Sequence, residues 1–115
     1  MNLATMFAVF AVKGAAAADP GPGPTGPPTG LSVVNGGTEV SPLARIHWTN
    51  GDATAYTRIY KRVSNCSGAE SLLTTVNPGI TSFDSSITVA AGFLVSHYRN
   101  GQESAKTSCV AWDGS

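Results

Sequence analysis

The stretch Ala44-Arg45-Ile46-His47-Trp48-Thr49 decides the fold, because apolar and polar residues alternate along it. Alternation with a period of two places Ala44, Ile46 and Trp48 on one face, which is typical of a half-buried β-strand. Trp48 is one of only two tryptophans, and a side chain that buries about 150–250 Å² can anchor a small core. We therefore predict that Trp48 is buried between two sheets. Its expected neighbours are Leu31, Ile59, Phe93 and Val95.

Short β-prone runs continue on both sides of this stretch and are separated by turn residues. Turn signals stand at Asn35-Gly36-Gly37, Asn50-Gly51-Asp52 and Asn77-Pro78-Gly79. The runs between them predict seven strands, at residues 31–34, 44–49, 55–63, 72–76, 81–83, 93–99 and 104–112. Seven short strands at this spacing indicate an all-β fold, a sandwich of two packed antiparallel sheets.

Length and composition are those of one domain with an N-terminal extension. The 115 residues include 13 glycines and seven prolines, and they divide into an apolar segment (1–18), a Pro/Gly-rich linker (19–30) and the sandwich (31–115). Seven basic and seven acidic side chains give a net charge of zero. Because the lysines and arginines are dispersed rather than clustered, we expect no nucleic acid partner.

The first segment contains an apolar run, from Leu3 to Val12, that carries no charge. A helix that spans a bilayer needs about 20 apolar residues, so we expect no spanning membrane segment. Two interpretations stay open. Ala16-Ala17-Ala18 before Asp19 is typical of a signal-peptide cleavage site, although Met1-Asn2 has no basic residue and Lys13 interrupts the run. Alternatively, the run is an arm that docks into neighbouring subunits, for which the helical stripe would be Leu3, Met6, Phe7 and Phe10.

Residues 19–30 read Asp-Pro-Gly-Pro-Gly-Pro-Thr-Gly-Pro-Pro-Thr-Gly. Glycine recurs at every third position only from Gly23 to Gly26, which is too short for a collagen triple helix. We interpret the segment as a semi-rigid, polyproline-rich spacer that carries the sandwich.

Side chains capable of chemistry are few and scattered. His47 and His97 are the only histidines; the strand pattern leaves His47 exposed and His97 half-buried. A metal site needs three or four ligands in one place, and no Gly-x-Ser-x-Gly elbow is present. Asp52, Asp84 and Asp113 lie in turns, where carboxylates cap backbone N–H groups. We expect no enzyme activity, no metal and no cofactor.

One polar row is a candidate partner surface. Tyr56, Arg58, Tyr60 and Arg62 alternate along the third predicted strand and share its outward face. Tyrosine and arginine are the residues that most often dominate interfaces. The alternative interpretation is an ordinary solvated sheet face.

Several of these pieces together resemble a fibronectin type III module over residues 28–112. The residues that carry the resemblance are Pro28-x-Gly30-Leu31-x-Val33, Ile46-x-Trp48, Tyr56 to Tyr60, Pro78-Gly79-x-Thr81-Ser82-Phe83-Asp84, Phe93-x-Val95 and Gly101-Gln102-Glu103-Ser104. Phe93 stands where the family usually has its corner tyrosine, so the detail of that corner differs. The resemblance implies a seven-stranded fibronectin type III sandwich that acts as a spacer or a binding surface, and not as an enzyme.

In such a fold Cys66 follows the third strand and Cys109 lies late in the last one. One strand lies between the third strand and the last one, so a bridge must cross about 10 Å of sheet. Bonded cysteines have Cα atoms within about 7 Å of each other. The loop after the third strand could fold over to close this distance. An intramolecular disulfide, free thiols and an intermolecular bridge all stay open.

Modules of this family occur in animal matrix proteins, in secreted bacterial glycosidases and in head and tail proteins of bacteriophages. With the apolar arm, the resemblance favours a structural protein of a virion, such as a bacteriophage accessory or decoration protein. Its partners would be other virion proteins, reached through the arm, and further copies of itself. The alternative is a secreted, extracellular binding or adhesion module whose signal peptide is removed.

Overall fold

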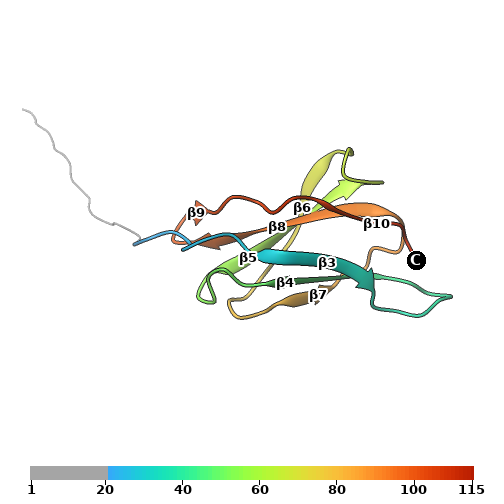
Figure 1. The fold of residues 1–115 in the computed structure, drawn as a ribbon, viewed down its shortest axis with the longest axis horizontal. Coiled ribbons are helices and arrows are strands. Elements are labelled where there is room, and N and C mark those ends of the chain that lie inside the picture. Colours follow the sequence, from blue (N-terminus) through green and yellow to red (C-terminus); the bar gives the residue numbers. More distant parts are fainter. Residues whose placement is uncertain (1–20) are drawn as a thin grey trace, which may run out of the picture.

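A computed structural model describes residues 21–115, and this part of the chain is all-β (Figure 1). The predicted arm or signal segment, with Leu3, Met6, Phe7 and Phe10, lies outside the described residues. Eight strands are present in residues 21–115, in two antiparallel sheets that pack face to face.

The smaller sheet contains β3 (Thr29–Asn35), β4 (Ala44–Thr49) and β7 (Ser82–Asp84), in the order β3-β4-β7. The stretch that opens the sequence analysis is β4, with the predicted bounds. It is the central strand, and it pairs antiparallel with both neighbours. Every second residue of β4 is buried, as alternation requires.

The larger sheet has the order β10-β8-β5-β6. Its strands are β5 (Tyr56–Val63), β6 (Glu70–Val76), β8 (Ala91–Arg99) and β10 (Val110–Trp112), and the short β9 (Gln102–Glu103) also pairs with β8. Strand β8 is central and pairs with β5 over eight residue pairs. Strand β6 forms one edge of this sheet.

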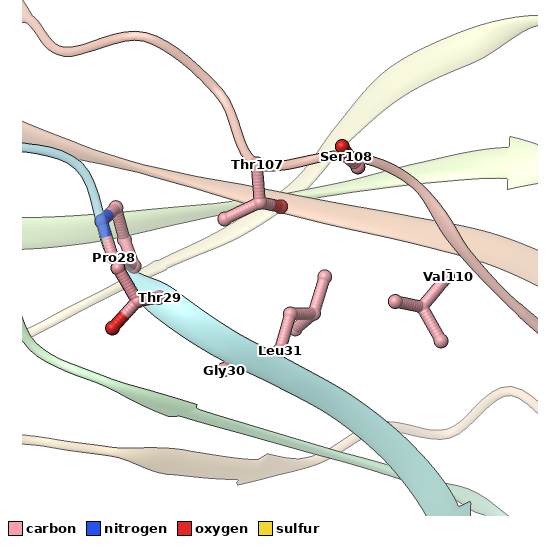
Figure 2. A pocket seen from close by; sticks show the side chains of 7 residues that line it. All are labelled: Pro28, Thr29, Gly30, Leu31, Thr107, Ser108 and Val110. Carbon is pink, nitrogen blue, oxygen red and sulfur yellow. The ribbon is translucent and has the colours of Figure 1, made fainter.

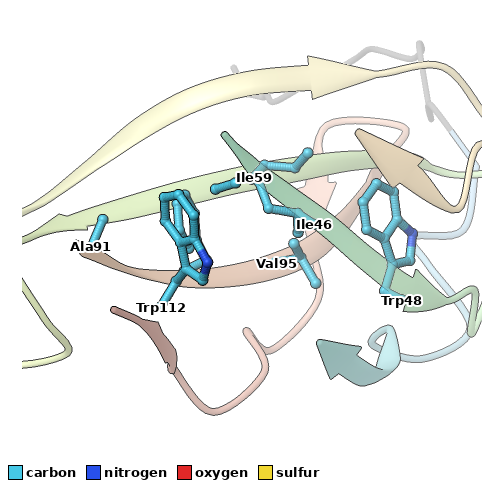
Figure 3. Packing of buried hydrophobic residues seen from close by; sticks show 8 residues of the cluster. Ile46, Trp48, Ile59, Ala91, Val95 and Trp112 are labelled. Atoms are coloured by element: carbon cyan, nitrogen blue, oxygen red, sulfur yellow. The ribbon is translucent and has the colours of Figure 1, made fainter. Parts of the chain in front are cut away.

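The core lies between the sheets, and Trp48 is inside it with no exposed surface. The predicted neighbours Ile59, Phe93 and Val95 belong to the same buried cluster, and Leu31 packs against it from β3. The prediction for Trp48 is therefore confirmed. Figure 3 shows Trp48 near one end of the cluster and the buried Trp112 beside Ala91 at the other, with aliphatic side chains between them.

Seven strands were predicted and residues 21–115 contain eight, because the short β9 was not predicted and the predicted last strand, 104–112, forms only over Val110–Trp112. Residues 104–109 are not in a strand and separate β9 from β10. Within this stretch the backbone N–H of Thr107 donates to the Val95 carbonyl, but the Val95 N–H donates to the Thr107 hydroxyl. A side chain thus takes the place of a backbone partner, and the ladder is interrupted.

The first strand begins two residues before the predicted boundary between linker and sandwich. Thr29 and Gly30 belong to β3, where Thr29 pairs with Thr49. The register shifts between Thr29 and Ser32, and Gly30 has a φ of 63°. Such a bulge inserts extra residues into a strand. The alternation of exposed and half-buried side chains therefore begins only at Leu31, although pairing with β4 begins at Thr29.

The two cysteines form a disulfide that crosses β8. The loop after β5 carries Cys66 over the outer surface of the sheet, and its Cα atom lies 5.8 Å from that of Cys109. Gly92 of β8 lies beneath the bridge. A Cβ atom at this position would be 2.7 Å from the Cys109 sulfur and 3.0 Å from the Cys66 nitrogen. Only glycine leaves room for the loop to fold across the strand.

Candidate partner-binding surface

The structure places Tyr56, Arg58, Tyr60 and Arg62 on the outer face of β5, while Thr57 and Ile59 between them are buried. The row is more enclosed than the sequence indicates. Tyr56 is 45 % exposed, whereas Tyr60 is buried. We call the outer side of β5 and β8, together with the residues of β6 and 103–106 that contact it, the outer face.

Arg58 is held by two neighbours on this face. Its guanidinium donates to Glu103 at 3.3 Å and lies over the ring of Tyr98, 3.8 Å from the ring centroid. Tyr98 pairs with Glu103 in the β8–β9 hairpin, which brings both partners to the same arginine. A stacked and paired guanidinium loses little rotamer freedom when it binds something else.

Tyr60 is covered by residues that follow β8 in the chain. Its hydroxyl donates to Glu103, which also accepts from Ser96, and the ammonium group of Lys106 lies 4.4 Å from the centroid of the Tyr60 ring. Burial raises the pKa of Tyr60, and the nearby Glu103 carboxylate raises it further. Burial alone would raise the pKa of Glu103, but hydrogen bonds from Ser96 and Tyr60 hold it below its usual range.

Arg62 and Lys106 converge on one carboxylate of the edge strand β6. Arg62 donates to Glu70 at 3.0 Å and to the Gly68 carbonyl at 3.2 Å, and Lys106 is 3.0 Å from the other Glu70 oxygen. The charges of the predicted row are therefore already paired within the domain. What the outer face offers to a partner is an ordered surface with the exposed side chains of Tyr56 and of Leu72, which is 52 % exposed.

A second site lies at one pole of the sandwich, where the Pro/Gly segment meets two loops. The Thr25 N–H donates to Asp52 at 3.2 Å, the Thr25 hydroxyl donates to the Gly51 carbonyl at 3.1 Å, and the side-chain amide of Asn100 donates to the Pro22 carbonyl at 2.7 Å. We call these contacts the N-terminal clamp. They fix the later part of the predicted spacer to the loops that follow β4 and β8.

Gly51 is required for the clamp. A Cβ atom at this position would be 2.1 Å from the Pro27 carbonyl oxygen, so any side chain here would displace the N-terminal segment. The Gly51 N–H donates at 3.0 Å to His97 Nε2. Gly51 therefore connects the clamp to the buried side chain of His97.

His97 is fully buried, and the prediction that it is half-buried is wrong. Its Nε2 accepts from Gly51, and Nδ1 is 3.2 Å from the Thr57 hydroxyl and 3.3 Å from the Tyr56 carbonyl. Acceptance at Nε2 leaves the proton on Nδ1, which can then donate to the Tyr56 carbonyl. Both ring nitrogens thus join β8 to neighbouring loops and strands. His47 is exposed on β4, as predicted.

Asp52 organises the loop between β4 and β5. One carboxylate oxygen accepts from the Thr54 N–H at 2.9 Å and from the Thr54 hydroxyl at 2.6 Å, and the other lies 3.6 Å from Arg99. The two bonds from Thr54 are the main reason that the pKa of Asp52 is lowered to about 2; the Thr25 amide and Arg99 lower it further, against the effect of burial. The turn-capping role predicted for this aspartate fits its contacts.

The lowered pKa of Asp52 predicts a specific acid sensitivity. A carboxylate whose pKa falls on folding stabilises the fold above its ordinary pKa, and this contribution is lost as the pH drops toward the folded value. Stability should therefore decrease between about pH 3.8 and pH 2. Asp52→Asn should flatten this part of the pH profile, which urea unfolding at a series of pH values would measure. Glu39→Gln, in an exposed loop, serves as control, and an equally steep profile in Asp52→Asn would contradict the assignment.

Residues 21–115 contain no cluster of three or more His, Cys, Asp or Glu side chains that could hold a metal ion. The described part of the chain also has no helix that could span a membrane.

Sequence reasoning missed the partners of the Tyr/Arg row and the clamp. Glu103 and Lys106 lie on segments far from β5 in the chain, whereas Glu70 begins the next strand, eight residues after Arg62. The folded sheet brings all three to the row. One signal was available: a hairpin centred on the turn Asn100-Gly101 would place Glu103 opposite Tyr98, as is observed.

Comparison with solved structures finds this architecture in an Fn3-like protein from Clostridium thermocellum. The TM-score is 0.62 with 18 % sequence identity, and the match covers 74 % of this chain and 88 % of that one. No protein-family model and no curated protein sequence matches the chain. The likeness defines the fold as a fibronectin type III-like β-sandwich.

Proposed function

We propose that the protein is a non-enzymatic structural protein of a virion, a bacteriophage head or tail accessory or decoration protein. Residues 1–18 anchor it to other virion proteins, and the sandwich is displayed outward. The observation that carries this proposal is the N-terminal clamp. Because Pro22 and Thr25 are bonded to loops of the sandwich, the domain keeps a fixed orientation relative to the chain that enters it, as a displayed module requires.

The roles of the polar side chains support a non-enzymatic function. Both nitrogens of His97 have structural partners, one in the Gly51 loop and the other at the start of β5. The carboxylates of Asp52, Glu70 and Glu103 accept hydrogen bonds or pair with cations inside the domain. These side chains therefore have structural roles, and none of the roles requires that they take part in a reaction.

A second candidate function is a secreted binding or adhesion module, and the disulfide favours it. Bridges such as Cys66–Cys109 form and persist in oxidising environments outside the cytosol. In this case Ala16-Ala17-Ala18 would be the cleavage site of a signal peptide. Mass spectrometry of the native protein separates the two candidates. A mature chain that begins at Asp19 would support secretion and contradict the arm.

Deletion of residues 2–18 tests the virion proposal directly. We expect the truncated protein to be lost from purified particles, because its anchor is missing. The melting temperature of the sandwich should stay nearly unchanged, because Trp48 and its neighbours lie within residues 31–112. Incorporation is measured by quantitative mass spectrometry of the particles, and melting by circular dichroism.

The full-length chain, expressed from the same promoter, is the control for incorporation. Truncated protein that still enters the particle would contradict anchoring by the arm. A large fall in melting temperature would instead mean that residues 2–18 pack on their own sandwich.

A further inference from the structure

An uncharged groove, lined by apolar and hydroxyl side chains, opens between β3 and the segment that leads into β10. It has a volume of about 440 Å³, and its lining residues are Pro28, Thr29, Gly30, Leu31, Thr107, Ser108 and Val110. Figure 2 shows the side chains of Leu31, Thr107 and Val110 directed into the space between the two segments. Leu31 and Val110 are half-buried. The groove therefore lies at the seam where the two sheets of the sandwich meet.

The walls of this groove are suited to an extended peptide. Strand β3 pairs with β4 on one side only and is an edge of its sheet, so it presents a row of backbone groups to whatever lies beside it. The opposite wall belongs to residues 104–110, where the ladder to β8 is interrupted. A peptide laid along such an edge gains main-chain hydrogen bonds and inserts alternate side chains.

The groove also defines the chemistry of its occupant. None of its lining residues is charged, so a charged segment would lose its hydration without gaining a partner. Leu3 to Val12 of this chain carries no charge and, as a strand, would be apolar on both faces. A segment of that kind suits a seam between two sheets better than an edge that faces water.

The course of the N-terminal segment argues that the occupant comes from another copy. Twenty residues precede Gly21, and the chain reaches β3 from the pole at which Asn100 binds Pro22. To fill its own groove, residues 3–12 of the same copy would have to turn back between residue 12 and this clamp, because the groove lies beyond the clamp along β3.

We propose that the groove binds residues 3–12 of a second copy of the chain. The inference rests on the proposed function and deepens it by naming what the arm recognises. Each copy then gives one arm and accepts one, either by reciprocal exchange between two copies or in a head-to-tail contact that closes into a ring or continues as a filament.

Two experiments on the full-length chain test this proposal. A photo-crosslinking amino acid replaces the exposed Thr29 on the groove wall, and unlabelled and ¹⁵N-labelled copies are mixed. We expect cross-links from position 29 to residues 3–12 in mixed-isotope pairs. Cross-links that stay within one copy, or that reach other segments, would overturn the proposal.

The second experiment fills the groove. Ser108→Arg places a bulky charge at an exposed position of the wall, and it should weaken self-association in sedimentation by about tenfold or more. Ser86→Arg, an exposed serine in the loop after β7, is the matched control and should have no effect. A Ser108→Arg chain that self-associates as tightly as the unchanged protein would overturn the proposal.

Incorporation into particles separates failure of the groove from failure of the anchor. If deletion of residues 2–18 abolishes incorporation but Ser108→Arg does not, the arm docks elsewhere, so the groove proposal is wrong and the proposed function stands. If the deletion has no effect on incorporation, the proposed function is wrong.

Discussion

Trp48→Ala is expected to lower the free energy of unfolding by about 3–5 kcal/mol, which is the usual cost of truncating a fully buried tryptophan. Trp48 has no exposed surface, and it packs between the sheets with Ile46, Ile59 and Val95 (Figure 3). A domain of this size has a total stability of about 5–15 kcal/mol. The variant should therefore be unfolded by much less urea, which equilibrium denaturation followed by circular dichroism would measure.

Two further variants separate packing from other effects. Trp48→Phe keeps an aromatic ring but removes the 2.9 Å hydrogen bond from the indole N–H to Asn50, so it should cost less than Trp48→Ala. Val40→Ala, at a loop position that is 95 % exposed, should leave the urea midpoint unchanged. A midpoint for Trp48→Ala equal to that of Val40→Ala would show that Trp48 does not anchor the core.

A strand could be predicted from the sequence where one of its faces is buried and the other is exposed to solvent. β4 satisfies this condition, and its alternation gave both its bounds and its inward face. β8 does not satisfy it, since residues 91–97 are all buried. Its outer side is covered at Gly92 by the disulfide loop and at Ser96 by Glu103, and both lie elsewhere in the sequence. The burial of His97 was underestimated for a similar reason, because Gly51 and its loop close over the ring.

The sequence was sufficient to place the four residues of the candidate surface on one face. It was not sufficient to predict whether they are exposed or already paired. Alternation along β5 places Tyr56, Arg58, Tyr60 and Arg62 on one face, and the structure places them there. Whether such a row is exposed depends on segments that fold onto it. Here the irregular segment after β9 brings Lys106 over Tyr60, and no local pattern predicts where an interrupted strand will lie. The clamp likewise depends on contacts across 26 to 78 residues of chain.

Removal of the Cys66–Cys109 disulfide is expected to destabilise the sandwich by about 4 kcal/mol on the chain-entropy model. The two cysteines are 43 residues apart in the sequence, so the bridge restricts a long loop in the unfolded chain. It also ties the loop after β5 to the beginning of β10, a strand of only three residues. The double variant Cys66→Ala/Cys109→Ala should unfold at lower urea than the native protein, and the native protein with reducing agent should behave in the same way.

Gly92→Ala provides an independent test, because it fills the space beneath the disulfide and leaves both cysteines in place. The added methyl group would meet the Cys109 sulfur at 2.7 Å, so the loop must move outward. In the oxidised protein this substitution should lower stability. In the Cys66→Ala/Cys109→Ala background its cost should be smaller, since the sulfur atom is gone and the loop is no longer tied across β8. Equal costs in the two backgrounds would mean that Gly92 is not there to make room for the disulfide.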